Sequence, residues 1–246
     1  MMQITPAVKQ LLIINIICFV GTQFVPQAEQ VLALHYFESQ SFRPWQFLTY
    51  MFMHGNLMHI FFNMFALYSF GSALEHFWGS KKFVFFYISC GLGAGIIHSL
   101  VNYYHFQSGM RVLVENGDTV SNIYDTLKEG KYNLGWEQIL SPKGFQEFIS
   151  SYVSPAVGAS GAIYGLLTAF AFMFPNAELM MMFIPVPIKA KYFVPVLVVI
   201  DLISGVTGGS IFGGNVAHFA HVGGALIGFI MMWYWKKNSF NDRRWN

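Results

Sequence analysis

Six stretches of mostly apolar residues constrain this chain more than any other feature of its sequence, because each is close to the roughly 20 residues that cross a bilayer. They cover residues 10–26, 55–77, 82–104, 155–174, 192–208 and 215–235. Charged residues make up only 11% of the chain, against about 25% in soluble domains. Backbone polar groups in lipid must be satisfied within the protein, so we expect an all-α, polytopic membrane protein with six transmembrane helices.

The first apolar stretch also resembles a signal peptide, with Lys9 before an apolar core at residues 11–20. No small-x-small cleavage site follows it, and further spans do, so we expect a retained helix. The two cysteines, Cys18 and Cys90, both lie in apolar runs. Free cysteines in such places behave as small buried hydrophobes, so we expect a structural role for both.

Basic residues predict the orientation of the helices. If six spans alternate, nine of the fourteen basic residues fall on one side of the membrane. These are Lys9, Lys81, Lys82, Lys189, Lys191, Lys236, Lys237, Arg243 and Arg244. Most of the others lie in one long loop, which counts less in the positive-inside rule. We therefore expect both termini to be cytoplasmic, with a bacterial inner membrane as the location.

The connecting segments suggest a single membrane domain over residues 1–246. Its largest interruption is a soluble, partly helical extracytoplasmic insertion at about 105–154. Residues 27–53 are too polar to span and too aromatic for a free loop, so an interfacial segment is expected. An interfacial connector is expected over residues 179–192. The uncharged, glycine-rich residues 207–215 are predicted to form a lid on the outer side, next to a mobile fifth helix.

Four polar side chains inside the apolar stretches fall at a similar depth toward the outer side. His59 and Asn63 are four residues apart, which places them on one helical face. Ser160 and His221 lie near the outer ends of the fourth and sixth stretches. Polar and ionisable residues are costly in lipid and often functional, so their shared depth indicates a site.

Small residues spaced four apart lie beside the serine and the histidine. Such spacing lets membrane helices pack with their backbones close together. Taken alone, the glycines predict only packing, and the serine predicts only a bond to its own backbone. The small residues are Gly161 and Gly165 in the fourth stretch, and Ala220, Gly224 and Gly228 in the sixth.

A histidine near a serine can remove the hydroxyl proton and so create a nucleophile. Neither Asp201 nor Glu75 is an evident third member, so the sequence predicts a Ser-His dyad of Ser160 and His221. The oxyanion of acyl transfer also needs hydrogen-bond donors. The Ser160 backbone N–H, the His59 ring and the Asn63 amide have suitable chemistry. Tyr164, one turn after Ser160, is predicted either to orient the His221 ring or simply to fill the core.

Four motifs in order resemble the rhomboid family of intramembrane serine proteases. They are the His54–Asn63 segment, the Gly71…Glu75…Gly79 pattern, the Gly158–Gly161 block and the segment from Ala220 to Gly228. The resemblance implies a six-helix core that cleaves transmembrane proteins within the lipid bilayer. It implies Ser160 as nucleophile, His221 as base, and His59 and Asn63 as oxyanion contributors, with Gly158, Gly161 and Tyr164 in support. No metal, cofactor or nucleic acid is expected.

Two details bear on the match. His218 competes with His221 for the role of base, but the family's small residues three and seven positions later fit only His221, with Gly224 and Gly228. Many members carry Trp-Arg in the first loop, whereas this chain has Trp45-Gln46. That difference leaves open how the loop is braced.

Two other classes of function compete with a protease. A catalytically inactive rhomboid-like protein that binds membrane clients should have lost the serine or the histidine, and this chain keeps both. A metal-dependent hydrolase or transporter could use His218, His221 and His59 as nitrogen ligands. The chain has no His-Glu-x-x-His motif, however.

Overall fold

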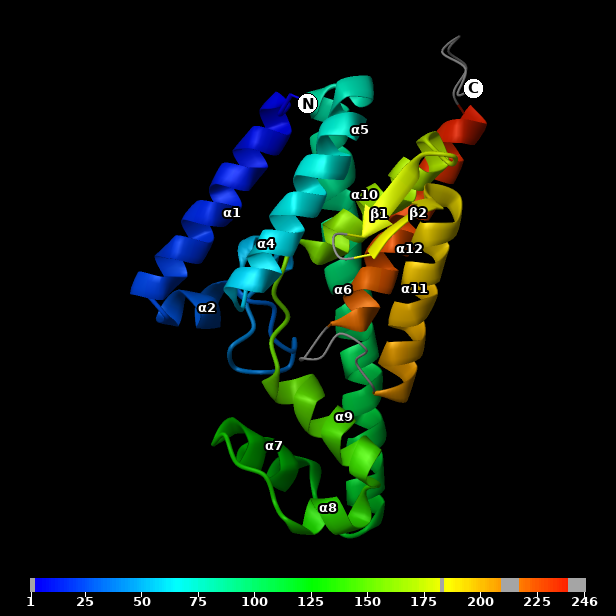
Figure 1. The fold of residues 1–246 in the computed structure, drawn as a ribbon. Coiled ribbons are helices and arrows are strands. Elements are labelled where there is room, and N and C mark those ends of the chain that lie inside the picture. Colours follow the sequence, from blue (N-terminus) through cyan, green and yellow to red (C-terminus); the bar gives the residue numbers. More distant parts are fainter. Residues whose placement is uncertain (1–2, 182–183, 209–216, 239–246) are drawn as a thin grey trace.

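A computed structural model describes residues 3–181, 184–208 and 217–238, and this part of the chain is almost entirely helical (Figure 1). The predicted all-α class is therefore confirmed. The helices are α1 (Pro6–Phe24), α2 (Gln27–Leu32), α3 (Gln46–Thr49), α4 (Leu57–Ala66), α5 (Ser72–Trp78), α6 (Ser80–Glu115), α7 (Val120–Lys128), α8 (Gly135–Ile139), α9 (Pro142–Val153), α10 (Ser160–Met173), α11 (Ala190–Thr207) and α12 (His218–Asn238). A 3-10 helix, Tyr50–Phe52, follows α3, and a π-helical turn, Leu67–Gly71, joins α4 to α5.

Helices occupy all six predicted spans. Within the described residues, four helical stretches are long and apolar enough to cross a membrane by themselves: α1, α4 with α5, α6 and α11. The fourth predicted span is the 14-residue α10, and the sixth is α12. These two helices pack against each other and against α6. Most of α10 is buried, so its environment is set by other helices and it can be short.

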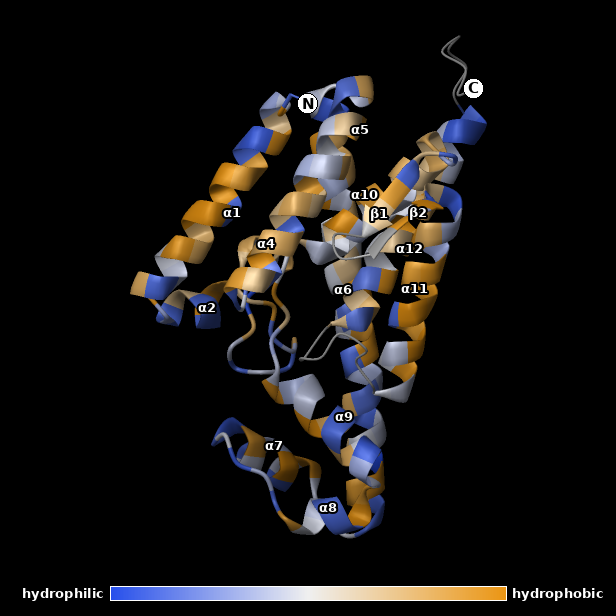
Figure 2. Ribbon diagram, viewed as in Figure 1, coloured by the Kyte–Doolittle hydropathy of each residue, from blue (hydrophilic) through white to orange (hydrophobic). Residues whose placement is uncertain are grey.

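The outer surfaces of the bundle are apolar. Figure 2 shows hydrophobic residues along α1, α4 and α11, and more hydrophilic ones at the ends of the bundle and around α7 to α9. Large side chains such as Ile17 and Phe62 are 64% and 41% exposed. Lipid contact accounts for exposed apolar side chains on helices that meet the criteria for a span. The fold is that of an integral membrane protein.

The α6 helix reaches well beyond the bilayer. At 36 residues it is roughly 54 Å long, against about 30 Å for the hydrocarbon core. The predicted insertion at 105–154 therefore begins inside this helix, which continues to Glu115. The α7, α8 and α9 helices lie along its far end, opposite the first turn of α1 and the last turn of α12 (Figure 1). They enclose a separate aromatic core, in which the Phe106 and Phe148 rings stack at 4.9 Å.

Glu75 joins three helices at the end of the bundle where α1 begins. Its carboxylate accepts hydrogen bonds from the backbone N–H groups of Ala7 (2.8 Å) and Val8 (2.9 Å). The hydroxyls of Thr5 (2.5 Å) and Ser80 (2.6 Å) donate to the same group. The first N–H groups of a helix lack partners within it, and a carboxylate there satisfies them and suits the helix dipole. Glu75 therefore fixes where α1 and α6 start.

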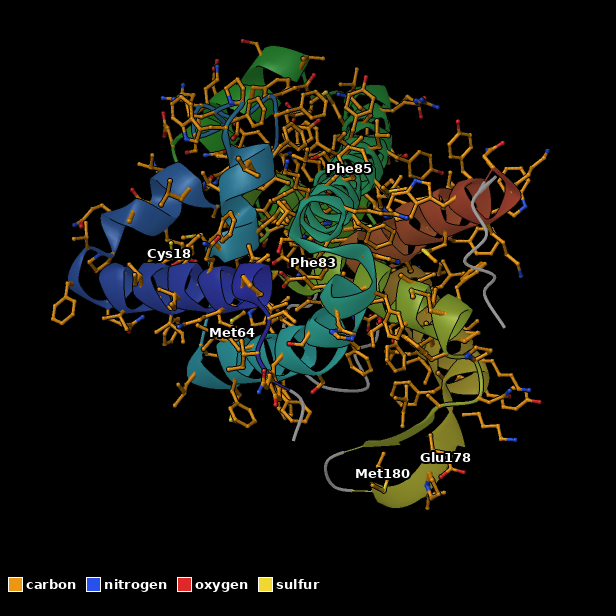
Figure 3. The ribbon with its side chains drawn as sticks, turned by 90° about the horizontal axis from the view of Figure 1, so that it is seen from above. Cys18, Met64, Phe83, Phe85, Glu178 and Met180 are labelled. Atoms are coloured by element: carbon orange, nitrogen blue, oxygen red, sulfur yellow. The ribbon has the colours of Figure 1, made fainter. Side chains whose placement is uncertain are left out.

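The predicted connector at 179–192 contains a β-hairpin. Strands β1 (Glu178–Met181) and β2 (Ile184–Lys189) are antiparallel, with Glu178 opposite Lys189. Figure 3 shows the hairpin projecting away from the helices, with Glu178 and Met180 labelled on β1. Met180 is 69% exposed. The hairpin returns the chain from α10 to the start of α11.

Candidate active site

Ser160 and His221 meet between α10 and α12. The Ser160 Oγ atom lies 2.8 Å from the His221 Nε2 atom, a hydrogen-bond distance. Ser160 is the first residue of α10, and His221 lies in the first turn of α12. Both side chains are half-buried. A hydroxyl and an imidazole at this distance can exchange a proton.

Glycines explain how two helices from distant parts of the chain come so close. A Cβ atom on Gly224 would lie only 1.8 Å from the Gly161 carbonyl oxygen. One on Gly228 would lie 2.8 Å from the Gly165 Cα atom. The backbones of α10 and α12 are thus in direct contact, as the spacing of small residues predicts.

The segment before Ser160 is held by the loop between α1 and α4. Leu34 and Ala156 form a two-bond bridge, and the Gly158 N–H donates to the Tyr50 carbonyl (2.9 Å). Gly158 has a φ of 126°, a conformation that favours glycine. A Cβ atom there would also lie 2.7 Å from His59 Nε2. The His59 ring therefore lies against Gly158, two residues before Ser160.

Gln46 braces that loop. Its side chain is fully buried, and its oxygen accepts from the backbone N–H groups of Arg43 (3.1 Å) and His35 (3.3 Å). Its nitrogen donates to the carbonyls of Ser41 (2.9 Å) and Val31 (3.2 Å). One amide thus ties together four points of the loop. This answers the question raised by glutamine at the position after Trp45.

Asn63 lies one turn beyond His59 on α4 and is buried. Its amide nitrogen donates to the His59 carbonyl at 2.9 Å. In the described part of the chain, no hydrogen bond joins Asn63 to Ser160. An amide NH₂ carries two hydrogens and this bond uses one, so the group retains the donor chemistry that an oxyanion requires.

His54, three residues before α4, packs edge-on against His59 with ring centroids 5.0 Å apart. The His54 side chain is buried, so its ring lies as a support beside the His59 ring.

Asp201, which was not an evident third member from the sequence, enters the site from α11. Its Oδ1 atom lies 3.1 Å from His221 Nδ1 and 2.6 Å from His218 Nδ1. The Tyr164 hydroxyl donates to its other oxygen. One sequence feature could have revealed this contact: Asp201 is a lone carboxylate in an apolar stretch, and such a group is costly in a membrane unless other side chains pair with it.

Tyr164 also stacks on the His221 ring, with centroids 4.3 Å apart and planes inclined by 13°. Of the two roles considered from sequence, the geometry favours orienting the histidine. His218, the other candidate for the base, occupies a different place: its ring centroid lies 6.4 Å from that of His221. Its described hydrogen bond is to Asp201.

The carboxylate and the two histidines also have donor atoms suited to a metal ion. The three ligand atoms lie within 4.8 Å of one another. Hydrogen bonds from both Nδ1 atoms to one carboxylate oxygen already account for this arrangement. His59, the third ligand of the metal hypothesis, is not a member of this group.

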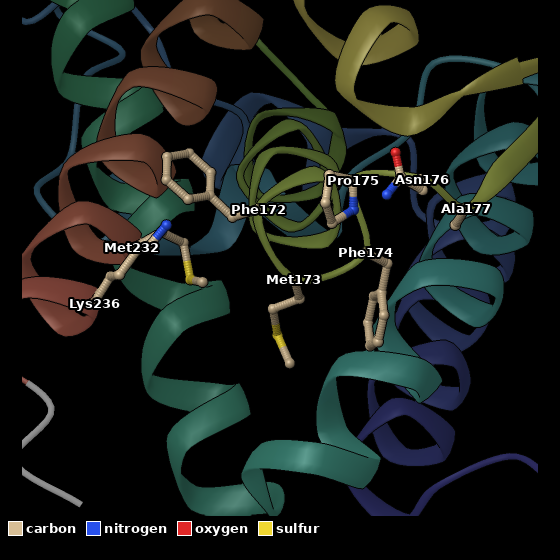
Figure 4. A pocket seen from close by; sticks show the side chains of 8 residues that line it. All are labelled: Phe172, Met173, Phe174, Pro175, Asn176, Ala177, Met232 and Lys236. Carbon is tan, nitrogen blue, oxygen red and sulfur yellow. The ribbon is translucent and has the colours of Figure 1, made fainter. Parts of the chain in front are cut away.

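Two cavities lie at opposite ends of α10. One, of about 240 Å³, lies between α6, α9, α11 and α12, and its lining includes His218, His98 and Asn102. The other, of about 420 Å³, is lined by Phe172–Ala177, Met232 and Lys236 (Figure 4). The larger cavity contains none of the site residues. The smaller cavity borders His218, but neither His221 nor Ser160 is in its lining. The predicted lid at 207–215 falls largely outside the described residues.

Comparison with known proteins agrees with these features. A model of the rhomboid domain matches residues 41–238. The chain is similar to Rhomboid protein 1, mitochondrial, of Saccharomyces cerevisiae, with 26% identity over 186 residues that cover 76% of this chain and 40% of that protein. An uncharacterised mitochondrial rhomboid protein of Schizosaccharomyces pombe is 29% identical over 227 residues, covering 80% and 53% of the two chains. Rhomboid protease AarA of Providencia stuartii is 26% identical over 202 residues, covering 76% and 54%.

The chain spans about half the length of these relatives or less. Two of them are named as mitochondrial and the third is bacterial, so the comparisons do not support the bacterial inner membrane expected from sequence. The resemblance read from the four motifs is confirmed. With a helical membrane bundle and a domain match over most of its length, this chain belongs to the rhomboid family.

Proposed function

We propose that this protein is an intramembrane serine endopeptidase that cleaves peptide bonds in or next to transmembrane segments of other membrane proteins. The observation that carries the proposal is the 2.8 Å contact between Ser160 Oγ and His221 Nε2. Relatives named as rhomboid proteins and a rhomboid protease agree with it. The substrate would approach within the bilayer, because the site lies between helices whose outer surfaces are apolar.

In the first half of the proposed reaction, Ser160 Oγ attacks the carbonyl carbon of the scissile bond and its proton moves to His221 Nε2. The Ser160 N–H, the His59 ring and the Asn63 amide stabilise the oxyanion. The position of Ser160 at the start of α10 supports the first of these, because the first N–H groups of a helix lack partners within it. The C–N bond then breaks, and His221 gives its proton to the leaving amine.

In the second half, a water molecule loses a proton to His221 and attacks the acyl-serine. Collapse of that intermediate releases the carboxylic acid, and the proton returns to Ser160. No step needs a metal or cofactor. We place both termini on the cytoplasmic side, because the start of α1, the start of α6 and the last turn of α12 lie at the end of the bundle opposite the insertion (Figure 1). These three helix ends carry Lys9, Lys81 with Lys82, and Lys236. The site then lies in the outer half of the membrane.

The test is cleavage of a single-span model substrate in proteoliposomes. We expect the wild type to cut it and Ser160→Ala to leave it intact. Ser72→Ala is a matched control, because Ser72 is buried in α5 and its hydroxyl has no hydrogen bond in the described structure. A serine-directed fluorophosphonate probe should label the wild type and the control but not Ser160→Ala. Cleavage by Ser160→Ala would overturn the assignment, and a wild type that neither cleaves nor labels would favour an inactive client-binding protein.

A further inference from the structure

We propose that Asp201 is a positioning residue that holds His221 in the one tautomer and orientation able to accept the Ser160 proton. The inference rests on the proposed function and deepens it: the site is a Ser-His-Asp arrangement assembled from α10, α12 and α11. Three contacts carry it, from His218, His221 and Tyr164 to the two carboxylate oxygens.

The hydrogen-bond donors around Asp201 fix the tautomer of His221. An ionised carboxylate only accepts hydrogen bonds, so an imidazole nitrogen beside it must carry a hydrogen. His221 Nδ1 lies 3.1 Å from Asp201 Oδ1. A neutral imidazole has one N–H, so the hydrogen on Nδ1 leaves the lone pair on Nε2. That is the nitrogen 2.8 Å from Ser160 Oγ.

The orientation of the ring is restrained from two directions. Tyr164 stacks on the face of His221 at 4.3 Å, and Asp201 holds its edge. Tyr164 also donates its hydroxyl to Asp201, so the two restraints are themselves linked. Without them the imidazole could rotate about its side-chain bonds or carry its hydrogen on Nε2, and in that tautomer it could not act as a base.

His218 completes the environment of the carboxylate. Asp201 is only 6% exposed, and a buried carboxylate is costly unless its oxygens are hydrogen-bonded. His218 supplies the shorter bond, 2.6 Å to Oδ1. We assign His218 to anchoring Asp201, which explains why α12 carries two histidines one turn apart.

The location of Asp201 on α11 has a consequence for access to the site. The buried stripe of α11 is Ala190, Val194, Asp201 and Ser204, so the carboxylate faces the bundle. Its bonds to α10 and α12 would all break if α11 moved outward. The base is therefore correctly oriented only while α11 is docked, and a substrate that displaced α11 would have to let it return before the first proton transfer.

The decisive variant is Asp201→Asn, which keeps the shape of the side chain. Its NH₂ group can donate to His221 Nδ1 and so favours the tautomer with hydrogen on Nε2. We expect kcat on the model substrate to fall on the order of 10⁴-fold, with KM unchanged. Ser204→Ala, a buried polar residue on the same helix, is the matched control and should keep wild-type kcat. Tyr164→Phe keeps the stacking but loses the bond to Asp201, and should lower kcat by about tenfold.

A second readout does not depend on activity. In protein labelled with ¹⁵N-histidine, a hydrogen shared between His221 Nδ1 and a carboxylate should give a strongly deshielded proton signal. His218 Nδ1 bonds the same carboxylate oxygen and should give a second signal of this kind, so the His221 signal is identified as the one that His221→Gln removes. We expect the His221 signal in the wild type and in Ser160→Ala, and we expect it to vanish in Asp201→Asn. Suppose that the wild type cleaves the substrate and Ser160→Ala does not. If Asp201→Asn then keeps kcat within threefold of the wild type, or retains the His221 signal, this inference is overturned and the proposed function stands. A lower melting temperature with unchanged kcat would also overturn it, because that is what a purely structural role predicts.

Discussion

Replacing Gly224 with alanine should separate the two helices that carry the serine and the histidine. The added Cβ atom would lie 1.8 Å from the Gly161 carbonyl oxygen, and 2.6 Å from its carbonyl carbon. These are backbone atoms of a buried helix, so no side chain can rotate out of the way. Relief requires the backbones of α10 and α12 to move apart.

The size of the movement follows from the contact. Real Cβ atoms essentially never approach other heavy atoms within 3.0 Å, so the gap must widen by at least 1.2 Å, the difference between 3.0 and 1.8 Å. Gly161 directly follows Ser160, and Gly224 is three residues after His221. If the helices separate uniformly there, the 2.8 Å bond between Ser160 and His221 lengthens to about 4.0 Å and is lost. A misplacement near 1 Å can cost about 10²-fold in rate, and overpacking costs about 1–3 kcal/mol of stability.

The assay is cleavage of the single-span substrate in proteoliposomes, with thermal unfolding measured on the same preparations. We expect Gly224→Ala to lose about 10²-fold in kcat while remaining folded at the assay temperature. Gly21→Ala is the control, because it also adds a methyl group to a membrane helix but meets nothing within 4 Å. Wild-type kcat and an unchanged melting temperature in Gly224→Ala would show that close backbone contact does not set the serine-to-histidine distance.

Three further predictions concern the rest of the fold. Glu75→Ala removes the hydrogen-bond acceptor at the start of α1 and should lower the free energy of unfolding by about 3 kcal/mol in a denaturant titration. Glu75→Gln keeps an acceptor oxygen and should recover part of this loss. Equal stability of both variants and the wild type would contradict the capping role. Burial acts to raise the pKa of Asp118, but hydrogen bonds from Asn122, Trp136 and the Thr119 N–H outweigh it and lower the pKa. The carboxylate therefore stabilises the insertion above its unfolded pKa of about 3.9 and loses this effect as pH falls through the lower folded value. Trp136 fluorescence should report an acid transition that Asp118→Asn removes, and an identical titration in both proteins would refute it. Gly109→Ala would place a Cβ atom 2.5 Å from the Phe148 ring and should loosen α9; limited proteolysis should then cut the insertion faster while the membrane helices stay intact.

Much of the fold could be predicted from the sequence because lipid imposes local rules. A span needs a long apolar run, and such runs are visible without knowing the partners. Strand hairpins obey weaker rules, so the pairing of Glu178 with Lys189 was missed in a segment that reads as a connector. The continuation of α6 from the predicted span into the insertion was not foreseen, because residues 105–115 cover an aromatic core that belongs to the insertion.

The sequence by itself determined the membrane class, the helices at the six apolar stretches and the polar side chains proposed for the site. It did so because helical spacing places His59 beside Asn63, and because the four motifs occur in a fixed order. Only the tertiary structure decided that Asp201 meets His221, since the two are on different helices and no spacing rule links them. It also decided that Gln46 braces the first loop through four backbone groups. Contacts between helices depend on how their faces pack, and a linear pattern does not contain that information.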